Sequence, residues 1–162
     1  MPDADRPLAI VDVDGVVADV RHRLHHIESR PKDWGAFFAA AGQDPPLAEG
    51  IARVRALAED HDVVYLTGRP EHLRRTTAEW LERHGIAGTG LLMRRGRDFH
   101  PARVTKAEEL RRLARDRTVA IVLDDDPEVV DALRADGWPV EHATWVPHSR
   151  TLRAAQEREG RT

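Results

Sequence analysis

The run Leu8-Ala9-Ile10-Val11-Asp12-Val13-Asp14-Gly15 decides how this chain folds. Its first part is short, apolar and rich in β-branched residues, which is typical of a strand buried on both faces. Asp14 and Gly15 then form a turn signal. Two carboxylates, Asp12 and Asp14, therefore stand where a buried strand ends.

Segments of strand and helix character alternate along the rest of the chain. Apolar runs rich in β-branched residues predict strands at 63–66, 91–93 and 119–123. The remaining expected elements are helices at 33–41, 49–60, 71–84, 104–116 and 127–136, and an edge strand within 140–146. This alternation is typical of an α/β domain with a mainly parallel sheet, whose ligand sites lie at the carboxyl ends of the strands.

The length of 162 residues fits one domain, which we place at 1–148, and a hydrophobic fraction of 41% can supply its core. The segment 20–47 leaves room for one or two helices but not for a full cap domain, so we expect a minimal cap insert. The segment 149–162 is a charged C-terminal tail with little core to anchor it.

The composition excludes several classes of protein. The chain has no cysteine, which excludes disulfides, thiolate zinc sites and cysteine nucleophiles. No apolar run approaches the ~20 residues that span a bilayer, and Met1 to Pro7 lacks the layout of a signal peptide. We therefore expect a cytoplasmic protein without a membrane partner. The net charge of −3 gives no global basic footprint for nucleic acid.

Polar clusters follow three of the predicted strands: Asp12 and Asp14, then Thr67-Gly68-Arg69, then Asp124-Asp125-Asp126. In a parallel sheet these clusters would meet at one edge. Carboxylates gathered in a small volume repel one another, and a divalent cation among them makes the arrangement tolerable. Ligands that are all oxygen, in a chain without cysteine, favour Mg²⁺ over zinc.

Each cluster has an ordinary explanation when it is taken alone. An Asp-x-Asp-Gly run is often just a turn, and Thr67 could simply cap a helix. One of the acids at 124–126 could serve as a helix N-cap, although three exceed that need. Lys106 alone is most simply a solvated helix residue. Their joint occurrence in this order favours a functional site.

These motifs together resemble the haloacid dehalogenase (HAD) superfamily of phosphohydrolases. The counterparts of its four motifs are Asp12-Val13-Asp14-Gly15-Val16, Leu66-Thr67-Gly68-Arg69, Lys106 and Asp124-Asp125. The resemblance covers roughly residues 8–142 and implies a Rossmann-like core.

The resemblance also implies a role for each of these residues. Asp12 would attack phosphorus and become an aspartyl-phosphate, and Asp14 would protonate the leaving oxygen and later deprotonate a water molecule. Thr67 would hydrogen-bond the transferring phosphoryl group, while Lys106 would neutralise its charge. The implied ligands of Mg²⁺ are Asp12, the main-chain carbonyl of Asp14, Asp124 and Asp125.

A closer resemblance is to the 3′-phosphatase domain of phage-type polynucleotide kinase–phosphatases. Arg23 matches an arginine after the first motif, and Gly68 and Arg69 match a Ser-Gly-Arg segment with a phosphate-facing arginine. The segment Thr76 to Leu81 matches a Thr-x-x-Trp helix. The chain departs from this pattern at Ala102, where the family has an acidic residue for which Asp98 could substitute. It also lacks the kinase phosphate-binding loop.

Three functions remain open at this stage. The first is a phosphatase that removes 3′-phosphates from RNA or DNA ends or from nucleotides, with Arg23, Gly68 and Arg69 as substrate contacts. The second is a small-molecule HAD phosphatase that acts on nucleoside 5′-monophosphates or sugar phosphates. The third is a noncatalytic module that binds Mg²⁺ or a phosphorylated partner. Trp34 could stack on a base, but we favour its packing with Phe37 and Phe38.

Overall fold

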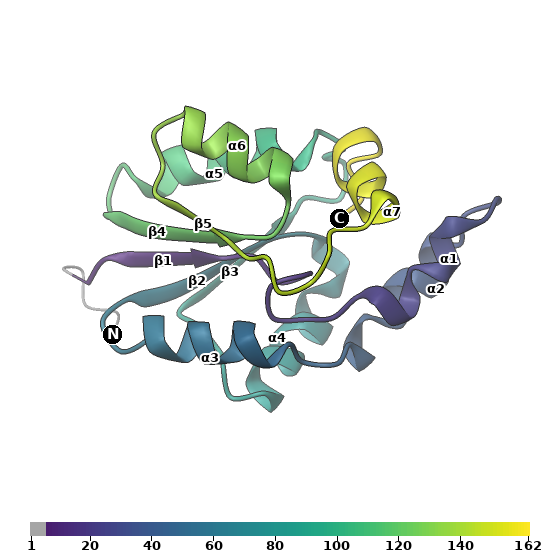
Figure 1. Cartoon of the computed structure of the whole chain (residues 1–162), viewed down its shortest axis with the longest axis horizontal. Coiled ribbons are helices and arrows are strands. Elements are labelled where there is room, and N and C mark those ends of the chain that lie inside the picture. The colour runs from purple at the N-terminus through teal and green to yellow at the C-terminus, as the bar shows by residue number, and fades with distance from the viewer. Residues whose placement is uncertain (1–5) are drawn as a thin grey trace.

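A computed structural model describes residues 6–162. Our interpretation of Met1 to Pro7 as a stretch without a signal-peptide layout falls mostly on residues 1–5, which lie outside this range. The sheet within it has five parallel strands in the order β3-β2-β1-β4-β5 (Figure 1). The strands are β1 (Leu8–Val11), β2 (Asp62–Pro70), β3 (Gly90–Arg94), β4 (Val119–Asp124) and β5 (Val140–His142). The predicted α/β fold with a parallel sheet is confirmed.

Helices cover both faces of the sheet (Figure 1). They are α3 (Ala48–Leu57) and α4 (Arg74–Arg83) on one face and α5 (Ala102–Leu113) and α6 (Pro127–Ala135) on the other, and a short 3₁₀ turn, η3 (Glu71–Leu73), precedes α4. None of the helices in the described part of the chain is both long enough and apolar enough to cross a membrane.

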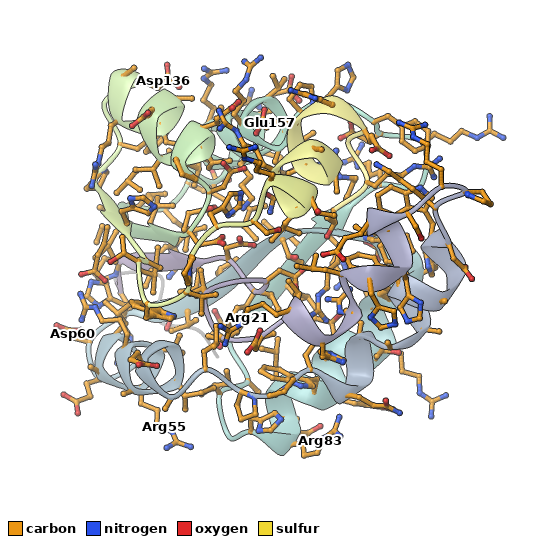
Figure 2. The ribbon with its side chains drawn as sticks, turned by 45° about the vertical axis from the view of Figure 1, so that its right-hand side comes forward. Arg21, Arg55, Asp60, Arg83, Asp136 and Glu157 are labelled. Carbon is orange, nitrogen blue, oxygen red and sulfur yellow. The ribbon has the colours of Figure 1, made fainter. Side chains whose placement is uncertain are left out.

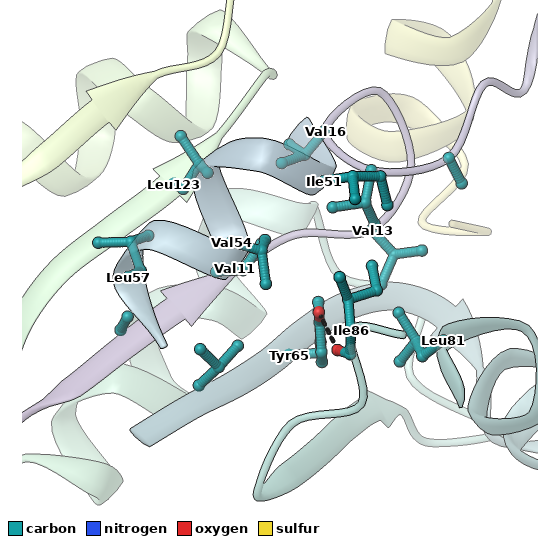
Figure 3. Close-up of a cluster of buried hydrophobic side chains, with 14 of the residues drawn as sticks. Val11, Val13, Val16, Ile51, Val54, Leu57, Tyr65, Leu81, Ile86 and Leu123 are labelled. Atoms are coloured by element: carbon teal, nitrogen blue, oxygen red, sulfur yellow. Dashed lines mark hydrogen bonds between the residues drawn. The ribbon is translucent and has the colours of Figure 1, made fainter. Parts of the chain in front are cut away.

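Strand β1 is buried on both sides because its residues alternate between two cores. Ala9 and Val11 pack in a cluster with Val54 of α3, whereas Leu8 and Ile10 belong to a second cluster that includes residues of α5 and α6. Figure 3 shows the first cluster, in which the Tyr65 hydroxyl donates a 2.5 Å hydrogen bond to the Ile86 carbonyl. This arrangement fixes the carboxyl end of β1, where Asp12 follows, in the middle of the sheet.

Strand β2 is longer than predicted. We expected it to cover 63–66 and to stop at Gly68, but it runs from Asp62 to Pro70. Its register with β3 shifts between Leu66 and Pro70, which lies opposite Arg94. The strand continues past Gly68 because β3 supplies this second pairing. The Thr67-Gly68-Arg69 motif therefore lies in extended backbone at the carboxyl edge of the sheet.

The insert 20–47 forms a small helical layer beside that edge. Its elements are η1 (Arg21–Arg23), α1 (His25–Glu28), α2 (Trp34–Ala39) and η2 (Ala41–Gln43). Asp33 caps α2 by accepting a 2.9 Å hydrogen bond from the Ala36 amide. Trp34 stacks on Phe38 with 5.9 Å between the ring centroids, and Phe37 and Phe38 are buried. The packing role that we favoured for Trp34 is what the structure has.

The segment after 148 differs from the expected unanchored tail. It forms α7 (Arg150–Arg153) and a π-helical turn, η4 (Ala154–Arg158), at the carboxyl edge of the sheet (Figure 1). Leu152 and Ala155 are buried in one cluster with side chains of the insert. Glu157 of η4, labelled in Figure 2, forms an ion pair with Arg103 of α5, with 3.3 Å between Glu157 Oε2 and Arg103 Nε. Leu152 and Ala155 therefore pack against apolar side chains of the insert, which lies far away in the sequence.

Candidate active site

The loop after β1 presents two buried carboxylates at the centre of the sheet edge. The Val13 amide donates a 2.8 Å hydrogen bond to Asp12 Oδ1, which fixes the orientation of that side chain. Gly15 follows with a φ of +78°, and a Cβ at this position would lie 2.0 Å from Asp125 Oδ2. Only glycine combines this backbone conformation with the close approach of the Asp125 carboxylate.

Lys106 of α5 lies between two of the acids. Its Nζ is 2.5 Å from Asp124 Oδ2 and 3.3 Å from Asp12 Oδ2. Burial acts to lower the pKa of Lys106, but the attraction of Asp12 and Asp124 outweighs it and raises that pKa. Burial raises the pKa of Asp12 well above its usual value, and Lys106 opposes this rise only in part. One lysine therefore does not balance the charge of the cluster.

Asp12, Asp124 and Asp125 form a group that fits a divalent metal ion. Each offers a carboxylate oxygen, and these oxygens lie within 4.8 Å of one another. Asp12 Oδ2 and Asp125 Oδ1 are buried and accept no hydrogen bond from any residue in the described range. Buried carboxylate oxygens without donors are the hard ligands that suit Mg²⁺. The three residues that the sequence assigned to a metal through their side chains do lie together.

Two histidines that we did not predict contact Asp125. His148 Nδ1 lies 3.2 Å from Asp125 Oδ2, and His142 Nε2 lies 3.1 Å from the Asp125 carbonyl oxygen. Burial raises the pKa of Asp125, and the neighbouring His148 offsets this in part. His142 lies at the end of the edge strand β5, and a polar residue at a strand end could have been predicted to lie near the site. No local pattern pointed to His148.

Asp14 lies against the two arginines that the sequence assigned to the substrate. Arg69 donates to Asp14 Oδ1 from Nε at 2.9 Å and from Nη2 at 2.6 Å, and Arg23 Nη2 is 3.3 Å from the same oxygen. Both guanidinium groups are about 1% exposed. Burial acts to raise the pKa of Asp14, but Arg69 and Arg23 outweigh it, and that pKa lies below its usual value.

Asp44, a residue missed from sequence, completes this buried network. Its Oδ1 accepts a 2.8 Å hydrogen bond from Arg23 Nε, and its Oδ2 accepts one of the same length from Arg69 Nη2. His22 Nε2 lies 2.6 Å from Oδ1. Burial raises the pKa of Asp44, and the two arginines offset this only in part. Asp44 stands before two prolines in the irregular insert, where it resembles an ordinary turn residue.

Thr67 and Gly68 directly precede Arg69 on β2, and Gly68 lies against the C-terminal segment. The Thr67 hydroxyl oxygen accepts a 3.1 Å hydrogen bond from the Arg69 amide. A Cβ on Gly68 would lie 2.1 Å from the carbonyl carbon of Thr162, so the C-terminal segment passes directly over this glycine. The Thr162 hydroxyl donates a 3.3 Å hydrogen bond to Asp14 Oδ2. The tail therefore borders the site, which we had not expected.

The structure also describes the two positions at which the chain departs from the family pattern, Ala102 and its candidate substitute Asp98. Ala102 is buried at the start of α5, at the position where the family pattern has an acidic residue. Asp98, the candidate substitute, accepts hydrogen bonds from the amide and the Nδ1 of His100 at 3.0 and 2.8 Å, and lies 3.9 Å from Arg94. Asp98 is thus engaged within the loop before α5.

Solved structures with the same fold support an assignment to a class. The structure of a Pnkp1/Rnl/Hen1 complex matches 90% of this chain at 23% identity with a TM-score of 0.72, and that of a Pnkp1/Rnl/Hen1 RNA repair complex matches 85% at 25% identity with a TM-score of 0.68. This chain covers 47% and 42% of those proteins, less than half of their length. A haloacid dehalogenase-like hydrolase from Streptococcus pneumoniae matches 95% of this chain and 92% of its own, at 12% identity with a TM-score of 0.59. The chain therefore has the fold of the HAD hydrolases.

The sequence narrows this class to one family. Residues 6–143 match the family described as the polynucleotide kinase PNKP phosphatase domain. This chain belongs to that family and is a HAD-type phosphatase. No curated protein sequence matched the chain significantly.

Proposed function

We propose that this phosphatase removes 3′-phosphates from the ends of nucleic acids or from nucleotides, through an aspartyl-phosphate on Asp12 and with the help of Mg²⁺. The observation that carries the proposal is the meeting of Asp12, Lys106 and Asp124 at the sheet edge of a domain from the PNKP phosphatase family. The side chains of Asp12, Asp124 and Asp125 would hold the ion, together with the main-chain carbonyl of Asp14.

Asp12 is the nucleophile in this scheme. The Val13 amide orients the Asp12 carboxylate, and one carboxylate oxygen would attack phosphorus while the other would hold the ion. When bound, Mg²⁺ supplies positive charge that keeps the carboxylates ionised and offsets their repulsion of the phosphoryl oxygens. Attack by Asp12 forms the bond from a carboxylate oxygen to phosphorus, and the bond from phosphorus to the substrate's 3′-oxygen breaks.

Asp14 carries the proton in both steps. Without substrate, Arg69 and Arg23 favour its ionised form. An arriving phosphate competes for the same guanidinium groups, which raises the pKa of Asp14 and suits it to protonate the leaving 3′-oxygen. Once that product has left, the ionised Asp14 can take a proton from the water that hydrolyses the aspartyl-phosphate.

Thr67 and Lys106 stabilise the phosphoryl group during transfer. The Thr67 oxygen is oriented by the Arg69 amide and keeps its own O–H to donate to a phosphoryl oxygen. Lys106 is positioned by Asp124 and adds a cation beside the attacking Asp12. Gly68 has no side chain to separate Thr162 from this edge of the site, and its backbone would border the bound substrate. Arg23 and Arg69 would bind the substrate phosphate from the Asp14 side.

RNA ends are the substrate class that the comparisons favour. Two of the similar structures contain Pnkp1 together with Rnl and Hen1, and one of them is described as an RNA repair complex. We therefore propose that this chain acts on 3′-phosphorylated ends in the cytoplasm, as part of an end-repair assembly.

The test compares phosphate release, with Mg²⁺ present, from matched oligonucleotides that carry a 3′-phosphate or a 5′-phosphate and from a set of mononucleotides and sugar phosphates. Asp12→Asn serves as the blank. A preference for the 3′-phosphate supports the proposal. Activity on small phosphates alone would keep the chemistry and overturn the nucleic-acid substrate.

A further inference from the structure

A cavity of about 350 Å³ lies between α5 and the carboxyl ends of β2 and β3. On one side its wall includes Thr67, Gly68 and Lys106, which also border the proposed phosphoryl site. On the other side it follows α5 as far as Arg115, just past the end of that helix. A substrate group in this cavity would therefore adjoin the reacting phosphate.

One wall of the cavity carries a buried cation with a free donor. The Arg94 side chain is only 3% exposed. Its Nε donates to the Gly68 carbonyl at 3.2 Å and its Nη1 to the His100 carbonyl at 2.7 Å. Its Nη2 is buried and has no hydrogen-bond partner within residues 6–162. A buried guanidinium nitrogen without an acceptor is costly and is suited to bind an anion.

Two further arginines at the cavity are unpaired. Arg95 and Arg115 line it, are exposed, and form no ion pair with any residue that the structure describes. Arg112 also lines the cavity, but it is paired with Glu109 at 2.7 Å. Besides Arg112, the cavity therefore offers the guanidinium groups of Arg94, Arg95 and Arg115, each with a free donor.

The acidic residues of the same cavity do not cancel these charges. Glu109 is paired with Arg112 at 2.7 Å, and Asp98 Oδ1 lies 3.9 Å from Arg94 Nη1. Glu108 is the one carboxylate of the cavity that forms no hydrogen bond or ion pair with any residue in the described range. This one unpaired carboxylate faces two unpaired guanidinium groups, Arg95 and Arg115, so the local charge attracts an anion.

We propose that this cavity is a second anion subsite, which binds the phosphodiester that precedes the 3′-phosphorylated nucleotide. The inference rests on the proposed function and adds to it a reason to prefer an oligonucleotide over a mononucleotide. With the terminal phosphate beside Thr67 and Lys106, the preceding phosphodiester lies toward Arg94, Arg95 and Arg115. Planar guanidinium groups with free donors are well matched to phosphate oxygens.

The experiment compares two substrates and two double variants. The substrates are a dinucleotide with a 3′-phosphate and the corresponding nucleoside 3′-monophosphate, which lacks the phosphodiester. Arg95→Gln/Arg115→Gln removes the two exposed cations of the cavity. Arg97→Gln/Arg111→Gln is the matched control, because it removes the same charge from the same loop and from α5, outside the cavity lining.

For the wild type and the control, we expect kcat/KM to favour the dinucleotide. In the cavity variant we expect this preference to fall roughly tenfold, while turnover of the mononucleotide is unchanged. The salt dependence of dinucleotide KM should also become shallower in the cavity variant. Equal kcat/KM values for both substrates in the wild type, or the same loss in both double variants, would overturn the subsite.

A binding measurement separates this inference from the proposed function. Calorimetric titration with a dinucleoside monophosphate, which has a phosphodiester and no terminal phosphate, does not depend on turnover. We expect it to bind to the wild type and more weakly to the cavity variant. Equal binding to both, or no binding to either, refutes the subsite even if 3′-phosphates are hydrolysed. If the cavity variant binds the dinucleoside monophosphate more weakly but the wild type does not hydrolyse 3′-phosphates, only the proposed reaction is refuted.

Discussion

Asp44→Ala tests whether the arginines at the site depend on a residue that the motifs do not contain. The change deletes the acceptor of hydrogen bonds from Arg23 Nε and Nη2, at 2.8 and 2.9 Å, and from Arg69 Nη2, at 2.8 Å. All three side chains are at most 1% exposed, so water does not replace the lost carboxylate without rearrangement.

The size of the effect follows from what remains after the substitution. Removing one partner of a buried ion pair typically costs about 3–5 kcal/mol. Arg23 and Arg69 both keep a contact with Asp14 Oδ1, so we expect the lower part of that range, about 3–4 kcal/mol. For a chain of this length, that loss lowers the unfolding temperature by roughly 6–16 °C.

Thermal unfolding followed by circular dichroism measures this shift, with Asp33→Ala as the control. Asp33 lies in the same insert and caps α2, and loss of a cap costs about 1 kcal/mol, or roughly 2–4 °C. Asp44→Asn should fall between the two variants, because the amide keeps one acceptor but turns a donor toward the guanidinium groups. If Asp44→Ala unfolds no lower than Asp33→Ala, Asp44 does not hold the arginines in place.

Three further predictions concern the nucleophile, the metal and the tail. Asp12→Asn should abolish phosphate release while the circular dichroism spectrum stays native, and near-normal turnover would contradict the proposed mechanism. EDTA should stop activity, and added Mg²⁺ should restore it. Mg²⁺ at 100 times its dissociation constant should stabilise the fold by about 2.7 kcal/mol, which would be measured as a higher unfolding temperature. In the control variant Asp124→Asn, Mg²⁺ should leave the unfolding temperature unchanged. Burial, with Asp126 and Glu128 nearby, raises the pKa of Glu157 from 4.5 to about 7. The folded state then holds that proton more tightly, so the contribution of Glu157 to stability falls as pH rises from about 4.5 to 7. Glu157→Gln should therefore raise the unfolding temperature relative to wild type at pH 8 but not at pH 4, whereas exposed Glu82→Gln should do neither; an equal shift at both pH values would speak against the raised pKa.

The positions of the strands along the chain and the residues that follow them could be predicted from local sequence. Short β-branched runs gave the strands, and the parallel arrangement then required the residues that follow them to meet at one edge. Asp12, Thr67 and Asp124 lie there for that reason. The predicted end of β2 was wrong because we interpreted Gly68 as the residue that stops the strand. The pairing of Pro70 with Arg94, which the local sequence does not contain, extends the strand beyond it.

Residues that reach the site through long-range packing had no such signal. Asp44 lies in an irregular segment, and its position depends on Trp80 of α4, whose Nε1 donates a 2.8 Å hydrogen bond to the Asp44 carbonyl. The burial of Leu152 depends in the same way on the insert, more than a hundred residues earlier in the chain. Hydrophobic periodicity describes one element at a time and does not contain these pairings.

The passage of Thr162 over Gly68 has a practical consequence for anyone who prepares this protein. A residue joined to Thr162 would begin beside Asp14 and Gly68, so an affinity tag placed there would start within the reaction site. Such a tag would have to displace Thr162 or cross the space that the phosphate needs. Kinetic constants from a preparation that carries a tag directly after Thr162 would then describe the tag as well as the enzyme.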